Sequence, residues 1–372
     1  MRRNLTKIQN VRKPRTSARP IRLGFVPLND CAPLVVACER GLFARFGLDV
    51  RLSRELGWAT VRDKLVHGEL DAAHAPCGLP LALALGHNCV RTDTTTALVL
   101  NLNGNAITLS EELWDAGVRD SATLREYLIS RRGRRTLTFG TVSPHSTHTF
   151  LLRRWLTEAG ADFTRDVRFV VTPPPQMPGN LASGHLDGFC AGEPWNSVAV
   201  AEGSGWIAAT SAELAPLHPE KVLLTTAAFA LRHEAEHLRL VAALIEACAL
   251  CDDPGNHAEI AQLLSDRRYV GRPAAVIARG FPGEFTGDFD LGHGRRQPLP
   301  DFTVFHRENA NEPSADKAAW IAQHLLDGAA RAAFTPAQLA HIFCADLFAR
   351  AQALRIETIP HETIRETRLL TA

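Results

Sequence analysis

The 372-residue chain lacks any long hydrophobic run, and its charges of opposite sign nearly cancel. No stretch reaches the roughly 18 consecutive apolar residues of a membrane span, so no membrane-spanning helix is expected. With 41 basic and 40 acidic residues, the formal net charge is +1, which gives no broad positive field for nucleic acid. The length exceeds what one compact core holds, and we therefore expect two lobes.

Cysteine is present, but not in the spacing of a disulfide framework or of a zinc site. The eight cysteines lie among apolar residues, which favours buried free thiols in a reducing compartment. Cys248 and Cys251 form a CxxC pair inside an expected helix at 238–251, and no second pair follows at zinc-finger spacing. We interpret both as core residues rather than as a metal or redox site.

Acidic residues and apolar runs are both absent from residues 1–20, which hold seven basic residues. A secretory signal needs a hydrophobic stretch of roughly 7–15 residues after its positive end, so we expect the chain to stay in the cytosol. A short tail of like charge is most often disordered and solvated, and we expect this for residues 1–20. Contact of this arm with an acidic partner or with RNA is the less favoured alternative.

Short apolar runs alternate with helical spacing along the rest of the chain, which is the βαβ rhythm of a parallel sheet with helices on both faces. In a first series we expect strands at 21–27, 48–52, 71–74 and 97–102, and helices at 32–46, 58–67 and 79–85. In a second series we expect strands at 137–142, 167–172 and 188–191, and helices at 124–130, at 147–158, around Leu181 and at 197–202. A strand at 222–231 is expected to re-enter the first lobe, followed by helices that brace it and an irregular loop at 280–305.

These patterns predict an α/β fold of two lobes in tandem. The expected parts are a disordered basic arm (1–20), a first part of lobe I (21–105), lobe II (106–218), and a second part of lobe I with C-terminal helices (219–372). Ligands of open parallel sheets bind at the carboxyl ends of the strands. Candidate functional residues are therefore expected at the strand-to-helix junctions.

Two junctions carry polar residues that suit an anion. His148 is expected in the first turn of a helix capped by Ser146 or Thr147, where free N–H groups and the helix dipole attract anions. An exposed loop residue is the plainer interpretation of His148, and His145 nearby has no third partner that would suggest a metal site. Asn105 ends the run Asn-Leu-Asn-Gly-Asn. This run is either a turn or the point where the chain crosses between the lobes, and the Asn105 amide could also serve as a donor that faces the cleft.

Three further positions are candidates by their place in the chain. Gly192 ends a strand and allows a ligand to approach the backbone closely. Trp58 begins a helix after the second strand, where its ring can form a cleft wall. Lys221 precedes the strand at 222–231, and a solvated surface lysine is its plainer interpretation.

Seven stretches occur here in the same order as in the solute-binding proteins of nitrate and bicarbonate ABC transporters: GFVPLNDCAPLVVACERGLFARFGLDV, GWATVRDKLVHGELDAAH, LNLNGNAITL, THTFLLRRWL, PPPQM, GEPW and HPEK. From residue 21 to about 325, the chain resembles this NrtA/CmpA-type family. The resemblance implies a two-lobed α/β clamp of the periplasmic-binding-protein type II class, a Venus flytrap with a mostly helical C-terminal extension. It also implies a ligand held between the lobes without a cofactor or a metal.

In the nitrate-binding relatives, a tryptophan, a glutamine, a histidine, a backbone glycine and a lysine hold the ligand. The resemblance places these roles on Trp58, Asn105, His148, Gly192 and Lys221. Asn105 departs from the family glutamine, so its amide reaches about 1.5 Å less far. Lys221 favours nitrate or nitrite as the ligand. Bicarbonate carries an O–H that needs an acceptor, and the bicarbonate-binding relatives have a carboxylate at this position. We therefore expect Lys221→Glu to abolish nitrate binding without unfolding the protein.

In a chain expected in the cytosol, the resemblance implies a nitrate sensor of the NasS type. Such a sensor holds a NasT-like antiterminator, an RNA-binding response-regulator protein, and releases it when nitrate or nitrite binds, without itself contacting nucleic acid or a membrane. The alternatives are the substrate-binding component of a nitrate or bicarbonate transporter and, less favoured, an enzyme on the same fold. Against an enzyme, the sequence shows no nucleophile elbow, no phosphate loop and no paired carboxylates at the cleft positions.

Overall fold

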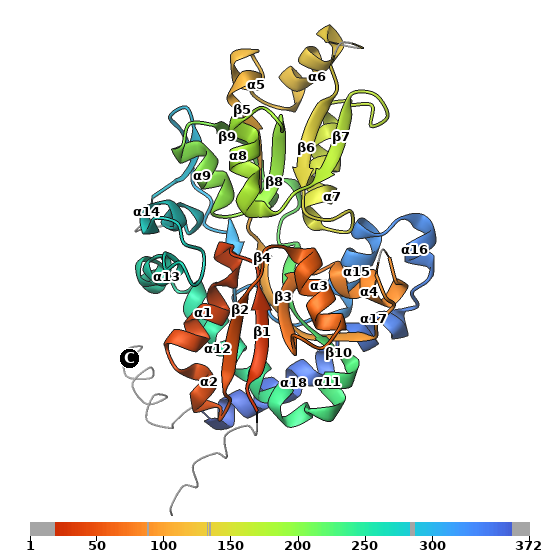
Figure 1. Cartoon of the computed structure of the whole chain (residues 1–372), viewed down its shortest axis with the longest axis vertical. Helices are drawn as coiled ribbons and strands as arrows, with labels where there is room; N and C mark the ends of the chain where they lie inside the picture. Colours follow the sequence, from red (N-terminus) through yellow and green to blue (C-terminus); the bar gives the residue numbers. More distant parts are fainter. Residues whose placement is uncertain (1–18, 88, 132, 134, 283–286, 359–372) are drawn as a thin grey trace, which may run out of the picture.

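The computed structural model describes residues 19–87, 89–131, 133, 135–282 and 287–358. These residues form two α/β lobes, each built around its own sheet (Figure 1). The predicted basic arm lies outside the described residues except at its end, where Arg19 donates a 2.9 Å hydrogen bond to the Asp71 carboxylate. None of the described helices is both long enough and apolar enough to cross a bilayer.

Six strands form the sheet of lobe I, in the order β13-β4-β10-β3-β1-β2. Their bounds are β1 Ile21–Phe25, β2 Val50–Arg54, β3 Ala72–Pro76, β4 Thr94–Asn103, β10 Pro219–Thr226 and β13 Thr303–Val304. β1 is parallel to β2 and β3, as the βαβ rhythm predicts, but β10 is antiparallel to β3 and β4. The prediction of a wholly parallel sheet is wrong because β4 leaves this lobe and β10 returns to it in the opposite direction.

The helices that follow the first strands lie largely where the apolar spacing predicts them. Their bounds are η1 Asn29–Cys31, α1 Ala32–Glu39, α2 Leu42–Arg45, α3 Trp58–Val66 and α4 Leu79–Leu85. The single helix predicted at 32–46 is interrupted at Gly41, whose φ of 68° lies in the left-handed region that favours glycine.

Five strands form the sheet of lobe II, in the order β7-β6-β8-β5-β9. Their bounds are β5 Asn105–Ser110, β6 Leu137–Thr141, β7 Val167–Val171, β8 Gly188–Gly192 and β9 Gly205–Thr210. The helices are α5 Glu111–Asp115, α6 Ser121–Ser130, α7 Thr147–Glu158, η2 Pro174–Gln176, α8 Met177–Ala182, α9 Trp195–Ala201 and α10 Ser211–Leu214. The apolar pattern missed β5 because half of its residues are polar, although all six are buried.

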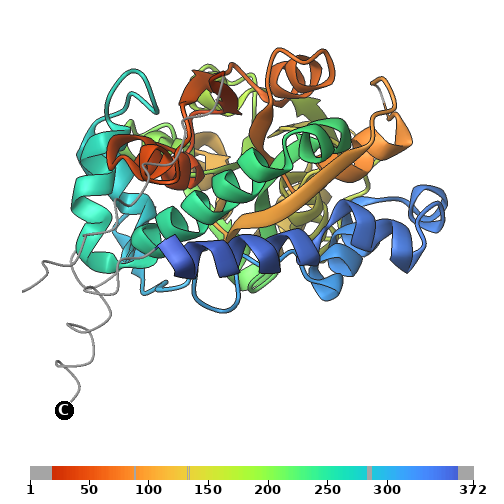
Figure 2. The same ribbon diagram turned by 90° about the horizontal axis from the view of Figure 1, so that it is seen from below.

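The remaining elements return to lobe I and extend it. They are α11 Ala227–Arg232, α12 Glu234–Asp252, η3 Pro254–Asn256, α13 His257–Leu264, α14 Ala274–Ile277, η4 Ala278–Gly280, β11 Phe289–Gly292, β12 Arg295–Gln297, α15 Ala315–Leu325, α16 Gly328–Ala332, α17 Pro336–Ile342 and α18 Ala345–Thr358. The strand predicted at 222–231 ends early, because Thr226 caps α11 by accepting the N–H of Phe229 at 3.1 Å. α12 and α18 lie side by side against lobe I, as the bracing prediction requires (Figure 2).

Part of the C-terminal segment packs on the other lobe. The segment 280–305, predicted to be irregular, contains β11, β12 and β13. Phe289 and Phe302 stack with ring centroids 4.2 Å apart and belong to one apolar cluster with Ile207 of β9. Residues from the segment assigned to lobe I by sequence therefore also contact lobe II.

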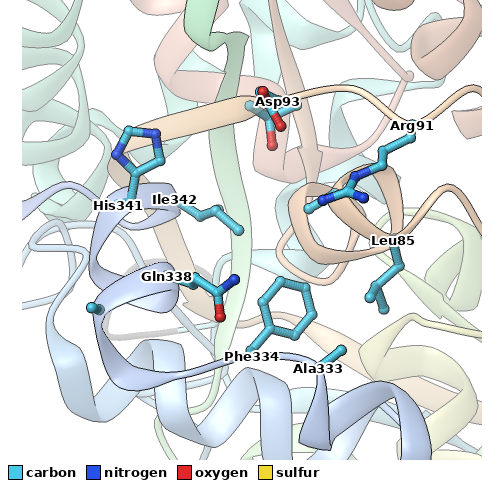
Figure 3. Close-up of a pocket in the computed structure, with 11 residues that line it drawn as sticks. Leu85, Arg91, Asp93, Ala333, Phe334, Gln338, His341 and Ile342 are labelled. Atoms are coloured by element: carbon cyan, nitrogen blue, oxygen red, sulfur yellow. The ribbon is translucent and has the colours of Figure 1, made fainter.

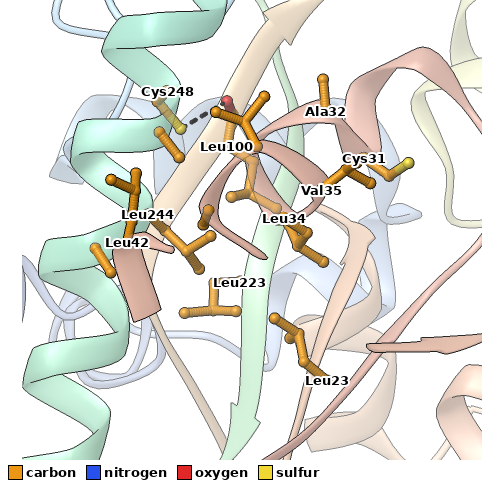
Figure 4. Close-up of a cluster of buried hydrophobic side chains, with 14 of the residues drawn as sticks. Leu23, Cys31, Ala32, Leu34, Val35, Leu42, Leu100, Leu223, Leu244 and Cys248 are labelled. Carbon is orange, nitrogen blue, oxygen red and sulfur yellow. Dashed lines mark hydrogen bonds between the residues drawn. The ribbon is translucent and has the colours of Figure 1, made fainter. Parts of the chain in front are cut away.

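The core of lobe I lies between its sheet and helices α1 and α12 (Figure 4). Leu100 and Leu223 of the sheet belong to this cluster together with Leu244 and Cys248 of α12. Cys248 Sγ donates to the carbonyl oxygen of Leu100 at 3.5 Å. All eight cysteines are free, and both residues of the CxxC pair are buried core residues, as predicted, whereas three other cysteines are partly exposed.

The two lobes are joined where β4 continues into β5. Asn103 and Gly104 have φ angles of 58° and 97°, so the chain turns sharply in a conformation that Asn and Gly tolerate. Asn105 is then the first residue of β5, in the second sheet. The chain returns to lobe I between α10 and β10.

Candidate functional site

The five residues singled out from the sequence meet at one place between the lobes. Trp58 is the first residue of α3 and Lys221 lies in β10, both in lobe I. Asn105 begins β5, His148 lies in the first turn of α7 and Gly192 ends β8, all in lobe II. Both lobes therefore contribute residues to the same region.

Lys221 occupies the middle of this region. Its Nζ lies 2.8 Å from Asp30 Oδ2 and 2.6 Å from Glu220 Oε1. The same ammonium lies 5.7 Å from the centre of the Trp58 ring, within the range of a cation–π interaction. The plainer interpretation of Lys221 as a solvated lysine is wrong, because its side chain is 0% exposed.

The three residues of lobe II surround the same two carboxylates. A Cβ added to Gly192 would lie 3.3 Å from Asp30 Oδ2 and 3.5 Å from Asn105 Oδ1, so this backbone lies against both side chains. His148 Nε2 lies 3.6 Å from Glu220 Oε1. We call Asp30, Trp58, His74, Asn105, His148, Gly192, Glu220 and Lys221 the polar cluster.

The position of His148 follows from the capping of α7. Of the two caps that the sequence allows, the structure has Ser146, whose Oγ accepts the N–H of Thr149 at 3.3 Å. Thr147 Oγ1 instead donates across the lobes to Glu220. His148 is thereby held in the first turn of a 12-residue helix, where the helix dipole is positive.

Several polar atoms of the cluster are buried without a hydrogen-bond partner among the described residues. Among them are Trp58 Nε1, both amide atoms of Asn105 and both ring nitrogens of His148. Trp58 is 5% exposed, and Asn105 and His148 are 0% exposed. A buried polar group without a partner costs about 1–3 kcal/mol, so these groups have much to gain from a polar ligand.

The charges of Asp30, Glu220 and Lys221 stabilise one another. Burial opposes ionisation of each group, but the opposite charges outweigh it. The pKa of Asp30 is therefore lowered, chiefly by Lys221 and also by a hydrogen bond from His74, and the pKa of Glu220 is held well below its usual value chiefly by Lys221. Asp30 and Glu220 in turn raise the pKa of Lys221. The cluster thus contains two carboxylates and one ammonium near neutral pH.

The two histidines of the cluster, unlike its acids and its lysine, are held in their neutral form by burial. Burial lowers the pKa of His148 to about 4, although the negative charge of Glu220 acts to raise it. Burial also lowers the pKa of His74. His74 Nε2 lies 2.8 Å from Asp30 Oδ1, and its ring lies 5.2 Å from the Trp58 ring. Both imidazoles are therefore neutral near pH 7, and a neutral imidazole offers one donor and one acceptor.

Sequence reasoning missed Asp30, His74 and Glu220. The prediction that the cleft positions hold no paired carboxylates is wrong, since Asp30 and Glu220 flank Lys221. Asp30 lies in the stretch NDCAPL and Glu220 in HPEK, and apolar residues follow both stretches. Those apolar neighbours were the only sign in the sequence that the two acids are buried. Only the folded arrangement shows that they are buried and face the lysine.

A cavity of about 180 Å³ adjoins the cluster between the lobes. Trp58 lines it from lobe I, together with Arg62, whose charge suits an approaching anion. Ser143 and His145 line it from lobe II, and His145 Nε2 lies 3.1 Å from His87 Nδ1 of lobe I. Trp58 therefore separates this cavity from the buried charges.

A larger cavity of about 420 Å³ lies elsewhere in lobe I, between α4, the start of β4 and helices α16 and α17 (Figure 3). Its lining includes Leu85, Arg91, Asp93, Phe334, Gln338 and His341. It contains no member of the polar cluster. Among the described residues, no group of three or more His, Cys, Asp or Glu side chains is arranged to hold a metal ion.

Comparison with known proteins places the chain among solute-binding proteins. Residues 15–265 match the NMT1-like family. The chain is 41% identical over 305 residues to the nitrate import ATP-binding protein NrtC of Synechocystis sp. strain PCC 6803, covering 82% of this chain and 45% of the relative. It is 43% identical over 304 residues to the bicarbonate transport ATP-binding protein CmpC of the same strain, covering 81% of this chain and 44% of the relative. It thus spans less than half the length of these two curated relatives.

A solved structure shows the same fold. The crystal structure of the periplasmic nitrate-binding protein NrtA from Synechocystis PCC 6803 superposes with a TM-score of 0.81 at 28% identity, covering 92% of this chain and 91% of that one. The predicted two-lobed α/β periplasmic-binding-protein type II fold is thereby confirmed.

Proposed function

The chain belongs to the NMT1-like family, and we propose that it binds nitrate or nitrite at the polar cluster between its two lobes. Nitrate has three acceptor oxygens in one plane and no proton to donate. The cluster offers donors at Trp58 Nε1, the Asn105 amide and a ring nitrogen of His148. The Lys221 ammonium has three N–H bonds and faces two carboxylates, so one N–H remains for a ligand.

The observation that carries this proposal is that the unpartnered donors come from both lobes. Trp58 belongs to lobe I, whereas Asn105 and His148 belong to lobe II. An anion that accepts from both lobes stabilises the arrangement in which they meet, and so it shifts the population toward the closed clamp. The role is that of a binding protein rather than an enzyme, because the two carboxylates are engaged by Lys221.

Nitrate is favoured over bicarbonate by the lysine at position 221. The relatives include proteins named for each anion at similar identity, so the names alone favour neither. Bicarbonate needs an acceptor for its O–H, and both carboxylates of the cluster already accept from Lys221, which leaves it the neutral acceptors at Asn105 and His148. Three donor groups without partners suit the anion that only accepts.

The anion assignment predicts the result of thermal unfolding in the presence of different salts. Nitrate and nitrite at about 100 times their dissociation constants are expected to add about 2.7 kcal/mol to the free energy of unfolding. Bicarbonate, sulfate and chloride at equal ionic strength serve as controls and are expected to shift the melting temperature less. A shift with bicarbonate alone, or no shift with any anion, would contradict the assignment.

A second prediction concerns Asn105→Leu, which replaces the amide with an apolar group of similar size. Because neither amide atom has a partner, its removal is expected to raise the stability of the ligand-free protein by about 1–3 kcal/mol. Nitrate affinity is expected to fall about tenfold or more because one donor is lost. Chemical denaturation and calorimetric titration measure the two effects.

Asn311→Leu is the matched control for this variant. Asn311 is also buried, but its amide donates to the carbonyl oxygens of Val99 and Phe305 at 2.9 and 2.8 Å. This exchange is expected to destabilise the protein. Loss of stability in Asn105→Leu with unchanged nitrate affinity would show that Asn105 is an ordinary structural amide.

We further propose that the protein acts in the cytosol as a nitrate or nitrite sensor that holds a NasT-like antiterminator and releases it when the anion binds. This role is supported by the relative named an ATP-binding protein for nitrate import, since ATP is bound in the cytosol. It is also supported by the two-lobed site, because a partner that prefers the open clamp is released when an anion closes it, and the antagonism must be reciprocal. The transporter component remains the second candidate, favoured by the structural similarity to NrtA.

The sensor role predicts a nitrate-dependent complex. Capture of the purified antiterminator on the immobilised protein is expected to weaken in millimolar nitrate. The Asn105→Leu variant, which is expected to fold and to bind nitrate about tenfold more weakly, is expected to need about tenfold more nitrate for the same release. Capture by the wild-type protein that is unaffected by nitrate would contradict the sensor role.

A further inference from the structure

The ammonium of Lys221 is not a free positive charge. Two carboxylates lie within 2.8 Å of its Nζ, one from Asp30 and one from Glu220. All three side chains are buried, at 4% exposure or less. An anion that enters this group meets at least as much negative as positive charge, which is costly in a dry site.

Protons on the neighbouring imidazoles are the remaining source of positive charge. His218 has an acceptor at each ring nitrogen, with the Ala215 carbonyl oxygen 2.9 Å from Nδ1 and Glu220 Oε2 3.2 Å from Nε2. An added nitrate makes the cluster more negative by one.

His148 is the imidazole placed to balance that charge. Both of its ring nitrogens lack a hydrogen-bond partner among the described residues, and Nε2 lies 3.6 Å from Glu220 Oε1. The other charged or titratable groups that act on it are Lys221, Asp30 and His218. Burial keeps it neutral in the absence of an anion, with a pKa of about 4, and an anion on its other side favours the charged ring.

We propose that nitrate enters the polar cluster together with one proton from solvent, and that His148 accepts this proton. The imidazolium then lies between two anions, with Glu220 on one side and nitrate on the other. No covalent bond is made or broken, and the bound pair of nitrate and proton leaves the net charge of the cluster unchanged. This inference rests on the proposed function, and it assigns to Glu220 the role of a positioning residue for the proton on His148.

The pH dependence follows from the sign of the shift. His148 has a lowered pKa without ligand and a raised one beside the anion, so the complex binds more protons than the free protein between these two values. Above the ligand-free pKa of about 4 and below the raised pKa of the complex, nitrate affinity is expected to fall by up to tenfold for each unit that the pH rises.

Calorimetric titration with sodium nitrate in two buffers tests the inference. At about pH 6.5, phosphate and Bis-Tris differ in their heat of ionisation, so proton uptake appears as a difference in the apparent binding enthalpy. We expect a difference that corresponds to most of one proton per nitrate. Nitrate binding with equal enthalpies in the two buffers would overturn the coupling and leave the proposed function standing. An absence of nitrate binding in both buffers would overturn both.

Two variants identify the proton acceptor. His148→Gln keeps a donor but cannot take up a proton, so its residual nitrate binding is expected to show equal enthalpies in the two buffers. His237→Gln is the matched control, because His237 is also buried on α12 with a pKa lowered by burial to about 4, and it is not part of the cluster. Continued proton uptake in His148→Gln would overturn the assignment to His148, and the wild-type titration tests the coupling even if this variant fails to fold.

Discussion

Replacing Lys221 with glutamate is expected to remove most of the stability of the protein, and not only its ligand site. The exchange places a third carboxylate beside Asp30 and Glu220, where none of the three is exposed to solvent. Loss of one partner from a buried ion pair costs about 3–5 kcal/mol, and here two carboxylates lose the same partner. Total stabilities of domains are about 5–15 kcal/mol. The sequence-based expectation that this variant keeps its fold is therefore replaced by the opposite one.

Circular dichroism during heating measures this effect, and a charge-neutral variant provides the control. The combination of Lys221→Met, Asp30→Asn and Glu220→Gln removes all three charges while nearly keeping their volumes. Exchange of a buried ionic group for neutral groups is often tolerated, so we expect this triple variant to fold and to lose nitrate binding. A Lys221→Glu protein that melts with the wild-type protein would contradict the arrangement of charges described above.

Trp58→Ala is expected to lower the free energy of unfolding by about 3–5 kcal/mol and to abolish nitrate binding. The Trp58 ring packs in an apolar cluster with Val26 and Leu28 of lobe I and Val142 of lobe II, so its loss leaves a cavity between the lobes. The ring also lines the 180 Å³ cavity that adjoins the polar cluster. Its removal therefore admits water to the buried charges, in addition to removing an indole donor.

Trp58→Phe separates these two roles. Phenylalanine keeps an aromatic wall but has no N–H, so the expected cost in nitrate affinity is about tenfold, the loss of one hydrogen bond to an anion. Trp155→Ala is the matched control, because Trp155 is buried in the lobe II core on α7 and not in the polar cluster. The Trp155→Ala variant is expected to be less stable than the wild-type protein but, where it is folded, to bind nitrate with unchanged affinity. Equal nitrate affinity in Trp58→Phe and the wild-type protein would remove the indole from the site.

The sequence predicts well those elements whose boundaries are encoded locally. The bounds of α4 and α7 agree with the prediction at both ends, because Ser146 caps α7 and Gly86 follows α4 in the left-handed conformation. The strand β5 was missed because three of its six residues are Asn, Thr and Ser, and these are buried together with the apolar ones. Burial of those polar residues depends on strands β8 and β9, which lie far away in the sequence.

The residues of the site also differ in how far the local sequence reveals them. His148 and Trp58 could be singled out because helix starts are visible in the sequence, and the structure places both at the meeting point of the lobes. Lys221 was a candidate by its place before a strand, but only the family resemblance favoured a binding role over a solvated lysine. Its partners Asp30 and Glu220 carry no local signal of their role, because the burial of a charge depends on the opposite charge that the fold places beside it.

The most direct test of the central claim is a crystal structure of the protein grown with nitrate. The account predicts a planar anion between the lobes, within hydrogen-bond distance of Trp58 Nε1, the Asn105 amide and Lys221 Nζ, and in contact with the backbone of Gly192. Nitrate bound only in the 420 Å³ cavity beside α17, or a polar cluster that holds no anion at saturating nitrate, would contradict it.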